Sequence, residues 1–223
     1  MRRWLNLRWL AVLGMLLAVL VGCGGGGGSD GPVFVGPGLV GIDDRPTVEI
    51  TAPELTVEYA LPGVAGTVVA SILSDQPTDG DIAFDPVLGT FTIIQGPDTL
   101  LFGIDSASPN QPDFRAFLDF PLDGSTGEPV IPLNATILSA TLTIFVNFVD
   151  FAATVPVLLD LVQYSVIAGL TPGDYSSVPL EFQAFDLFNT DAGRDVLIDV
   201  TPLMTAAQSL GLTDFQVRFL LGP

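Results

Sequence analysis

The sequence predicts an all-β fold, a jelly-roll-like antiparallel β-sandwich with one short helix near the C-terminus. Two observations support this prediction. From Pro46 onward, apolar residues alternate with polar ones in short runs, which is the period of a strand with one buried face. These runs are separated by segments rich in Pro, Gly and Asp, as is typical of sandwiches and barrels. We therefore expect a β-domain over residues 46–223, preceded by a signal peptide and a flexible tether.

The alternation is clearest in the strand expected over residues 137–149, where apolar and polar side chains would take opposite faces. Its core face would hold Ala140, Leu142, Ile144, Val146 and Phe148, and its other face Thr141, Thr143 and Asn147. Further strands are expected over residues 47–51, 56–60, 67–73, 82–84, 90–94, 99–104, 115–122, 155–166, 180–185, 196–200 and 215–221. A helix is expected over 203–210, with Thr201 as N-cap, Pro202 in its first turn and Gly211 after its end.

The N-terminus, residues 1–22, has the pattern of a secretory signal peptide. Arg2, Arg3 and Arg8 form a cationic region, and residues 9–22 form an apolar run that is too short to span a bilayer. The alternative is a short N-terminal membrane helix that ends at a cysteine by chance. The segment Leu20-Val21-Gly22-Cys23 resembles the lipobox of bacterial lipoproteins. This resemblance implies cleavage before Cys23 and acylation of its sulfur.

Lipidation at Cys23 would make the membrane a partner of this chain. Several acyl chains hold a protein stably on a membrane, whereas one chain binds only marginally. The expected location is therefore the cell envelope, with a lipid anchor in the bacterial outer membrane and the domain either periplasmic or surface-exposed. Residues 23–45 would form the tether, because they are rich in Gly and Pro and show no sustained periodicity.

The charge of the processed chain excludes nucleic acid as a partner. Cleavage would leave four arginines against 25 acidic residues, a formal charge of −21. Such a protein cannot neutralise phosphates and is repelled by anionic headgroups. With 48% hydrophobic residues the chain can bury a sizeable core without disulfide bonds.

The processed chain is not expected to be an enzyme. It has no histidine, no lysine and no free thiol, which removes catalytic triads, Schiff bases and cysteine nucleophiles. Asp191, Asp195 and Asp199 offer a carboxylate pair of the kind that glycosidases use. The alternative for Asp199 is to cap the turn or helix that follows it.

With these side chains, the only metals that the chain could bind are hard cations such as calcium, because zinc and copper sites need imidazole or thiolate. Asp79, Asp81 and Asp85 in "PTDGDIAFDP" place carboxylates at alternate positions around a glycine and are the candidate site for a structural calcium ion. The alternative is a solvated hairpin in which the aspartates stabilise the turn. No other cofactor is expected.

The second half of the chain resembles DNRLRE-type domains. The matching segments are "FRAFLDFPL", "IPLNATILSATLTIFV", "VPVLLDLVQYS" and "DVLIDVTPLMTAAQSLGLTDFQVRFLL". The resemblance covers about residues 90–223 and implies a jelly-roll β-sandwich of bacterial surface proteins, some of which look like carbohydrate-binding modules. The family pattern continues past the last strand of this chain, so the closing strand would come from upstream or leave an open edge. Residues 46–88 would add strands to the same sandwich or form a small separate module.

An extracellular glycan is the partner that this resemblance implies. Sugars stack on exposed aromatic rings, and processing removes both tryptophans. Tyr164 and Tyr175 are therefore the candidate ligand-binding residues. Three functions stay open: a non-catalytic adhesion or glycan-binding module, a purely structural envelope lipoprotein, and a polysaccharide-acting hydrolase, for which the catalytic side chains are missing.

Overall fold

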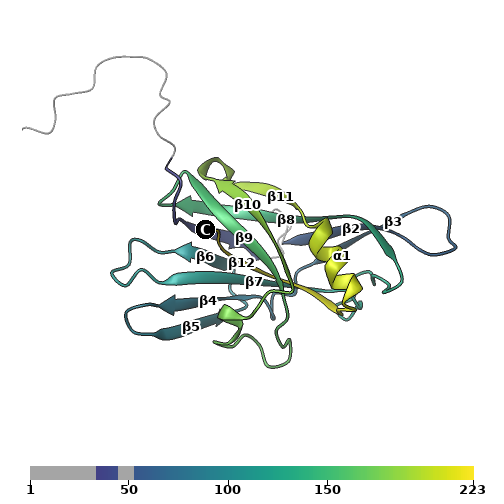
Figure 1. Cartoon of the computed structure of the whole chain (residues 1–223), viewed down its shortest axis with the longest axis horizontal. Coiled ribbons are helices and arrows are strands. Elements are labelled where there is room, and N and C mark those ends of the chain that lie inside the picture. The colour runs from purple at the N-terminus through teal and green to yellow at the C-terminus, as the bar shows by residue number, and fades with distance from the viewer. Residues whose placement is uncertain (1–33, 45–52) are drawn as a thin grey trace, which may run out of the picture. The chain divides into compact units, whose positions relative to one another are not determined.

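Twelve β-strands and one α-helix make up most of the chain that the computed structural model describes, residues 34–44 and 53–223 (Figure 1). The all-β prediction is confirmed, and so is the helix near the C-terminus. The strands are β1 (Leu39–Asp43), β2 (Glu54–Ala60), β3 (Val68–Leu73), β4 (Gly80–Asp85), β5 (Thr90–Gln95), β6 (Thr99–Ile104), β7 (Asp113–Pro121), β8 (Thr136–Asp150), β9 (Thr154–Val162), β10 (Glu181–Phe188), β11 (Arg194–Asp199) and β12 (Asp214–Leu221). The helix is α1 (Thr201–Ser209), and two 3-10 turns are η1 (Asp174–Ser176) and η2 (Asn189–Asp191).

The strands form one antiparallel sheet that curls into a sandwich. Its main order is β10-β9-β12-β7-β6-β1-β8-β2-β3, while β4 joins the other side of β7 and carries β5, and β11 pairs with β8. The sheet turns between β6 and β7, which pair over only two residues, Gly103 with Phe114 and Ile104 with Asp113. Gly103 has a φ of +106°, and a Cβ there would lie 2.0 Å from the carbonyl oxygen of Gly38, so this corner requires glycine.

Strand β8 shows why the alternating sequence folds this way. Ala140, Leu142, Ile144 and Val146 are buried and belong to the main core, whereas the residues between them are half-buried. Strand β2 pairs with β8, and Leu55 and Val57 of β2 pack into the same core. The strands before residue 88 therefore extend the sandwich that β8 to β12 build.

Strand β1 corrects the expected tether, because Leu39–Asp43 lies within the segment 23–45 and is fully integrated in the sheet. It lies between β6 and β8, and all five of its residues are buried. A Cβ at Gly41 would lie 2.4 Å from the ring of Phe148, so glycine here makes room for an aromatic cover. The two glycines and two aspartates in "GLVGIDD" make the segment look like a linker, yet the glycines allow close packing and both aspartates are buried.

The other boundaries differ in ways that hydrogen bonds explain. The strand expected over 155–166 ends at Val162, because the amide of Tyr164 donates to the Gln216 side chain instead of continuing the ladder. The helix begins at Thr201, so Thr201 is its first residue and not its N-cap. The expected strand 47–51, the signal peptide and most of the tether lie outside the described residues.

Strand β12 has a partner on each side, β7 and β9. The strand edges that stay unpaired within the described part of the chain therefore lie elsewhere. Two of them, those of β10 and β11, face each other across the side of the sandwich.

Candidate ligand-binding site

A hollow of about 380 Å³ lies between β10 and β11. Strand β10 pairs with β9 and strand β11 with β8, and in the described residues no strand pairs with their facing edges. Almost all Cα–Cα distances between β10 and β11 exceed 8 Å, whereas directly paired residues lie about 4.5–5.5 Å apart. We call this hollow the edge slot. It is lined by Gln183, Ala184, Phe185, Asp186, Val196, Leu197, Ile198 and Asp199.

The alternation of side chains gives the edge slot an apolar floor and a polar rim. Phe185 and Val196 are half-buried and pack against the main core, and Ile198 is buried within it. The rim includes the exposed residues Asp186 and Asp199. The Nε2 of Gln183 donates to the backbone oxygen of Asp199 at 2.9 Å, so one side chain bridges the slot at this end.

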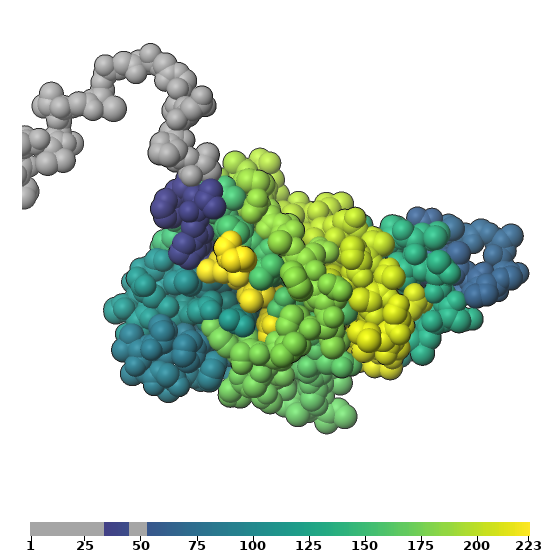
Figure 2. All heavy atoms as spheres, in the orientation of Figure 1, coloured from purple at the N-terminus to yellow at the C-terminus, as the bar shows by residue number. Residues whose placement is uncertain are grey.

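The surface beside the slot is apolar and acidic. Phe182 on β10 and Leu197 on β11 are 59% and 70% exposed. Both strands lie on the face of the molecule that Figure 2 shows, in the yellow-green region. These two strands carry four exposed carboxylates and one exposed guanidinium. They belong to Glu181, Asp186, Asp195, Asp199 and Arg194. The local electrostatic potential is therefore negative, and a cationic ligand is favoured.

Tyr175 does not form the exposed platform that was expected from the sequence. It is 8% exposed and its hydroxyl donates to Asp113 at 2.5 Å. The guanidinium of Arg115 lies over its ring, 3.8 Å from the centroid, and also donates to its carbonyl oxygen. Phe84 and Phe91 pack on its other sides. Burial and the bond to Asp113 raise the pKa of Tyr175. The ring therefore packs inside the protein and offers no surface on which a sugar could stack.

Tyr164 is likewise 8% exposed, so it offers no platform for a sugar either. Its ring packs edge-on against Phe117, with centroids 5.7 Å apart. Burial raises the pKa of its hydroxyl well above the usual range, and the nearby carboxyls of Asp79 and Asp119 add to this shift. Neither ring therefore offers the exposed stacking face on which the expectation rested, and ligand binding at Tyr164 and Tyr175 stays an untested prediction.

Asp79, Asp81 and Asp85 do not converge on one point. Asp81 and Asp85 lie four residues apart on β4, about 13 Å along the strand. Each carboxylate has a backbone partner: Asp79 accepts from the amide of Asp119, Asp81 from that of Leu101, and Asp85 from those of Val87 and Leu88. In the residues that the structure describes, no three His, Cys, Asp or Glu side chains are placed to hold a metal ion. The three carboxylates are thus not gathered around one point in this structure, and calcium binding stays an untested prediction.

Asp79 belongs instead to a buried carboxyl cluster with Asp44 and Asp119. All three are at most 1% exposed. Burial raises the pKa of Asp44 to about 7 and that of Asp119 to about 6, and it also raises the pKa of Asp79 well above its usual value. The nearby carboxyl of Asp44 adds to the rise in the pKa of Asp79, because two negative charges at this buried place would repel each other.

Two of the three aspartates before α1, Asp191 and Asp199, serve local structure. The carboxylate of Asp199 accepts from the amide and the hydroxyl of Thr201, and these bonds hold its pKa below the usual range. Asp191 accepts from the amide of Phe188 at the turn that leaves β10. Both carboxylates thus stabilise turns, which matches the structural alternative for Asp199.

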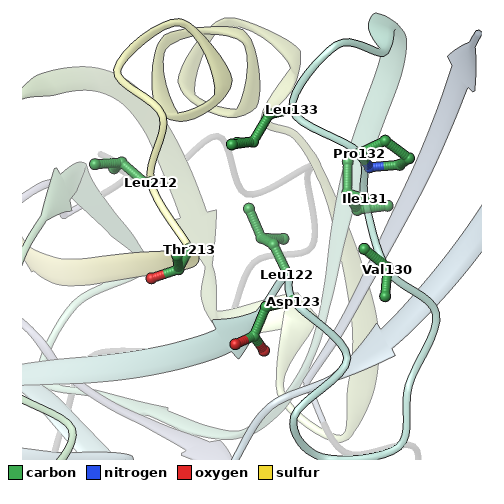
Figure 3. Close-up of a pocket in the computed structure, with 8 residues that line it drawn as sticks. All are labelled: Leu122, Asp123, Val130, Ile131, Pro132, Leu133, Leu212 and Thr213. Atoms are coloured by element: carbon green, nitrogen blue, oxygen red, sulfur yellow. The ribbon is translucent and has the colours of Figure 1, made fainter.

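A second, smaller hollow of about 190 Å³ lies between the loop after β7 and the turn before β12 (Figure 3). Leu122, Leu133 and Leu212 from these two segments line it, with Asp123 and Thr213 as its polar side chains. The hollow is mostly apolar and offers few groups that would orient a polar ligand. The edge slot combines apolar floor, carboxylates and unpaired backbone, and is therefore the better candidate.

The edge slot was not predicted from the sequence, because each of its two strands shows only its own pattern of apolar and polar residues. Phe182 and Leu197 break the apolar-in, polar-out rule on β10 and β11, and this exposure of two large side chains is the one local clue. That the two strands end up opposite each other depends on their pairing with β9 and β8, which the sequence does not reveal.

The chain has no match among the protein-family models, the curated proteins and the solved structures with which it was compared. The resemblance to DNRLRE-type domains and the lipidation of Cys23 therefore stay predictions. Within residues 34–44 and 53–223, no helix has the length and apolar character that crossing a membrane requires.

Proposed function

We propose that this chain is a non-catalytic cell-envelope lipoprotein whose β-sandwich is a surface adhesion or glycan-binding module. The observation that supports this proposal is the edge slot. Its two strands are each held by a neighbour on the far side, and its floor is continuous with the core. A hollow built on rigid strands keeps its shape without a ligand, which lowers the entropic cost of binding.

The proposed binding surface differs from the one expected from the tyrosines. In the edge slot, Phe182 and Leu197 supply exposed apolar area, while Gln183 and Asp186 supply an amide and a carboxylate that orient a ligand. Arginine, carboxylates and hydroxyls are the reactive types available, and the carboxylates of Asp191 and Asp199 are engaged in turns. This supports binding in preference to hydrolysis.

A purely structural envelope lipoprotein is the second candidate, because the candidate tyrosines Tyr164 and Tyr175 and two of the four arginines are engaged in internal contacts. A binding assay distinguishes the two. The full chain in detergent would be probed against a panel of neutral and cationic glycans and against intact envelope fragments. We expect a retained ligand whose binding is weakened by Ala184→Trp, which covers the slot from its exposed rim.

The matched control is Val69→Trp, which adds the same ring at an exposed position of β3. Equal weakening by both variants, or no retained ligand on any surface, would contradict the binding function and favour the structural one.

A further inference from the structure

We propose that the edge slot binds an extended polypeptide segment with alternating apolar and basic residues, which adds a strand between β10 and β11. This inference rests on the proposed binding function and names the chemical class of its ligand. It combines three features of the slot: its width, its floor and its charge.

The width of the slot fits one strand. Neighbouring strands of a sheet lie about 4.7–4.9 Å apart, so two strands that flank a third are about 9–10 Å apart. Strands β10 and β11 are separated by more than 8 Å at almost all positions, and the Gln183 side chain reaches across the gap at one end. An inserted segment would therefore pair with both free edges.

Free edges of this kind are normally protected. Proteins cover them, shorten them, or place proline and lysine on them. Strand β10 runs for eight residues and β11 for six, and neither contains proline, although both carry charged residues and Gln183 occupies the carbonyl oxygen of Asp199. The remaining backbone groups of two long edges that face each other can satisfy those of an added strand on both sides, as in β-strand addition. A glycan has no matching rows of amide and carbonyl groups.

The floor and the rim select the side chains of the ligand. Alternate residues of an inserted strand would point down onto Phe185, Val196 and Ile198, which is apolar surface continuous with the core. The residues between them would point outward, beside Asp186 and Asp199. The residues that point down onto the floor are therefore expected to be apolar.

The charge of the rim selects the outward-pointing residues of the inserted strand. Glu181, Asp186, Asp195 and Asp199 are exposed on the two strands, with Arg194 as their one exposed cationic residue. The outward side chains of an anionic or neutral segment would gain no favourable electrostatic energy in this negative potential, whereas lysine or arginine would pair with the carboxylates. The predicted ligand is therefore basic on one face and apolar on the other.

A blocked nonapeptide of alternating lysine and valine tests this proposal. Binding to the full chain in detergent would be measured by titration calorimetry at physiological salt. We expect saturable one-to-one binding. A peptide of the same composition with its lysines and valines in two blocks should bind roughly tenfold more weakly or worse, because only the alternating order presents one apolar face. Methylation of alternate backbone nitrogens should also abolish binding, because it removes donors from one edge.

Charge reversal locates the site. Asp186→Lys combined with Asp195→Lys should weaken binding by roughly tenfold or more, since like charges then face the peptide. Asp98→Lys combined with Glu128→Lys makes the same change in net charge on loops away from β10 and β11 and should leave the affinity within about twofold. Equal loss in both double variants would mean attraction by overall charge and would overturn the proposal.

Three further outcomes also decide it. Binding of a neutral glycan that Ala184→Trp weakens, without peptide binding, would overturn the peptide inference and leave the proposed function intact. Failure of peptides, glycans and envelope fragments alike would overturn both. A dimer of the chain that Asp186→Lys with Asp195→Lys dissociates would identify a second copy as the occupant and contradict a basic partner.

Discussion

Arg218 on β12 and Asp160 on β9 lie directly opposite each other in the strand register and form a buried ion pair, with Nη2 and Oδ2 2.5 Å apart. The same guanidinium donates to the carbonyl oxygens of Asp174, Tyr175 and Ser177. It therefore fixes the loop that contains η1 onto the sheet. A buried cation is tolerated here because a carboxylate and several carbonyl groups satisfy its donors.

Arg218→Met should destabilise the fold by about 3–5 kcal/mol, because it leaves Asp160 buried without its cation. The double variant Arg218→Met with Asp160→Leu should recover part of this loss, since no unpaired charge remains but the carbonyl oxygens of Asp174, Tyr175 and Ser177 still lack their donor. Urea denaturation measures both values. Arg194→Met, at an exposed position of β11, is the control and should change the free energy of unfolding by less than about 0.5 kcal/mol. A double variant as unstable as the single one would contradict this account.

Much of the fold is readable from the sequence because its strands have one buried face. The period of two in residues 137–149 places β8 and its core side chains within a residue or two, and Gly211 correctly marks the end of α1. Each of these features depends on neighbours along the chain.

The rest depends on contacts between distant segments. Leu39–Asp43 resembles a linker by composition, and only the approach of β6 and β8 makes it a buried strand. Tyr175 looks like a ligand platform until Asp113 and Arg115 close around it, 62 and 60 residues away. The edge slot needs the pairing of four strands. Sequence periodicity carries no information on such approaches.

Leu142→Asp should cost several kcal/mol of stability, because it places a charge on the fully buried face of β8. Thr143→Asp should be far milder, because its side chain lies on the half-buried face. Thermal unfolding of the two variants compares neighbouring positions with the same introduced group. Equal losses of melting temperature would contradict the assignment of the faces.

Cys23→Ser should release the chain from the membrane, because serine cannot form the thioether on which acylation depends. Membrane fractionation after salt extraction measures the effect. Cys23 lies outside the described residues, so this experiment tests the lipobox resemblance directly. If the variant still pellets with the membrane and resists salt, the lipoprotein assignment fails.

The buried carboxyl cluster predicts an unusual dependence of stability on pH. Burial raises the pKa of Asp44 to about 7 and those of Asp81 and Asp119 to about 6, against 3.8 for an ordinary aspartate. The folded state therefore binds more protons than the unfolded state between about pH 4 and 7. Stability falls with rising pH wherever the folded state holds more protons. This contribution is present in full below pH 4 and is lost as the pH rises through 6 to 7.

The melting temperature should therefore be higher at pH 5 than at pH 8, by several degrees. Asp44→Asn should flatten this dependence, because the amide keeps the size of the side chain and cannot ionise. Asp85→Asn is the matched control: Asp85 is half-buried at the end of β4, and bonds from the Leu88 amide and the Asn110 side chain hold its pKa below the usual range, so its contribution changes only in acid. Thermal unfolding at both pH values checks all three proteins. A wild type that is more stable at pH 8 than at pH 5 would show that the cluster ionises at little cost, and an Asp44→Asn profile parallel to the wild type would place the titrating groups elsewhere.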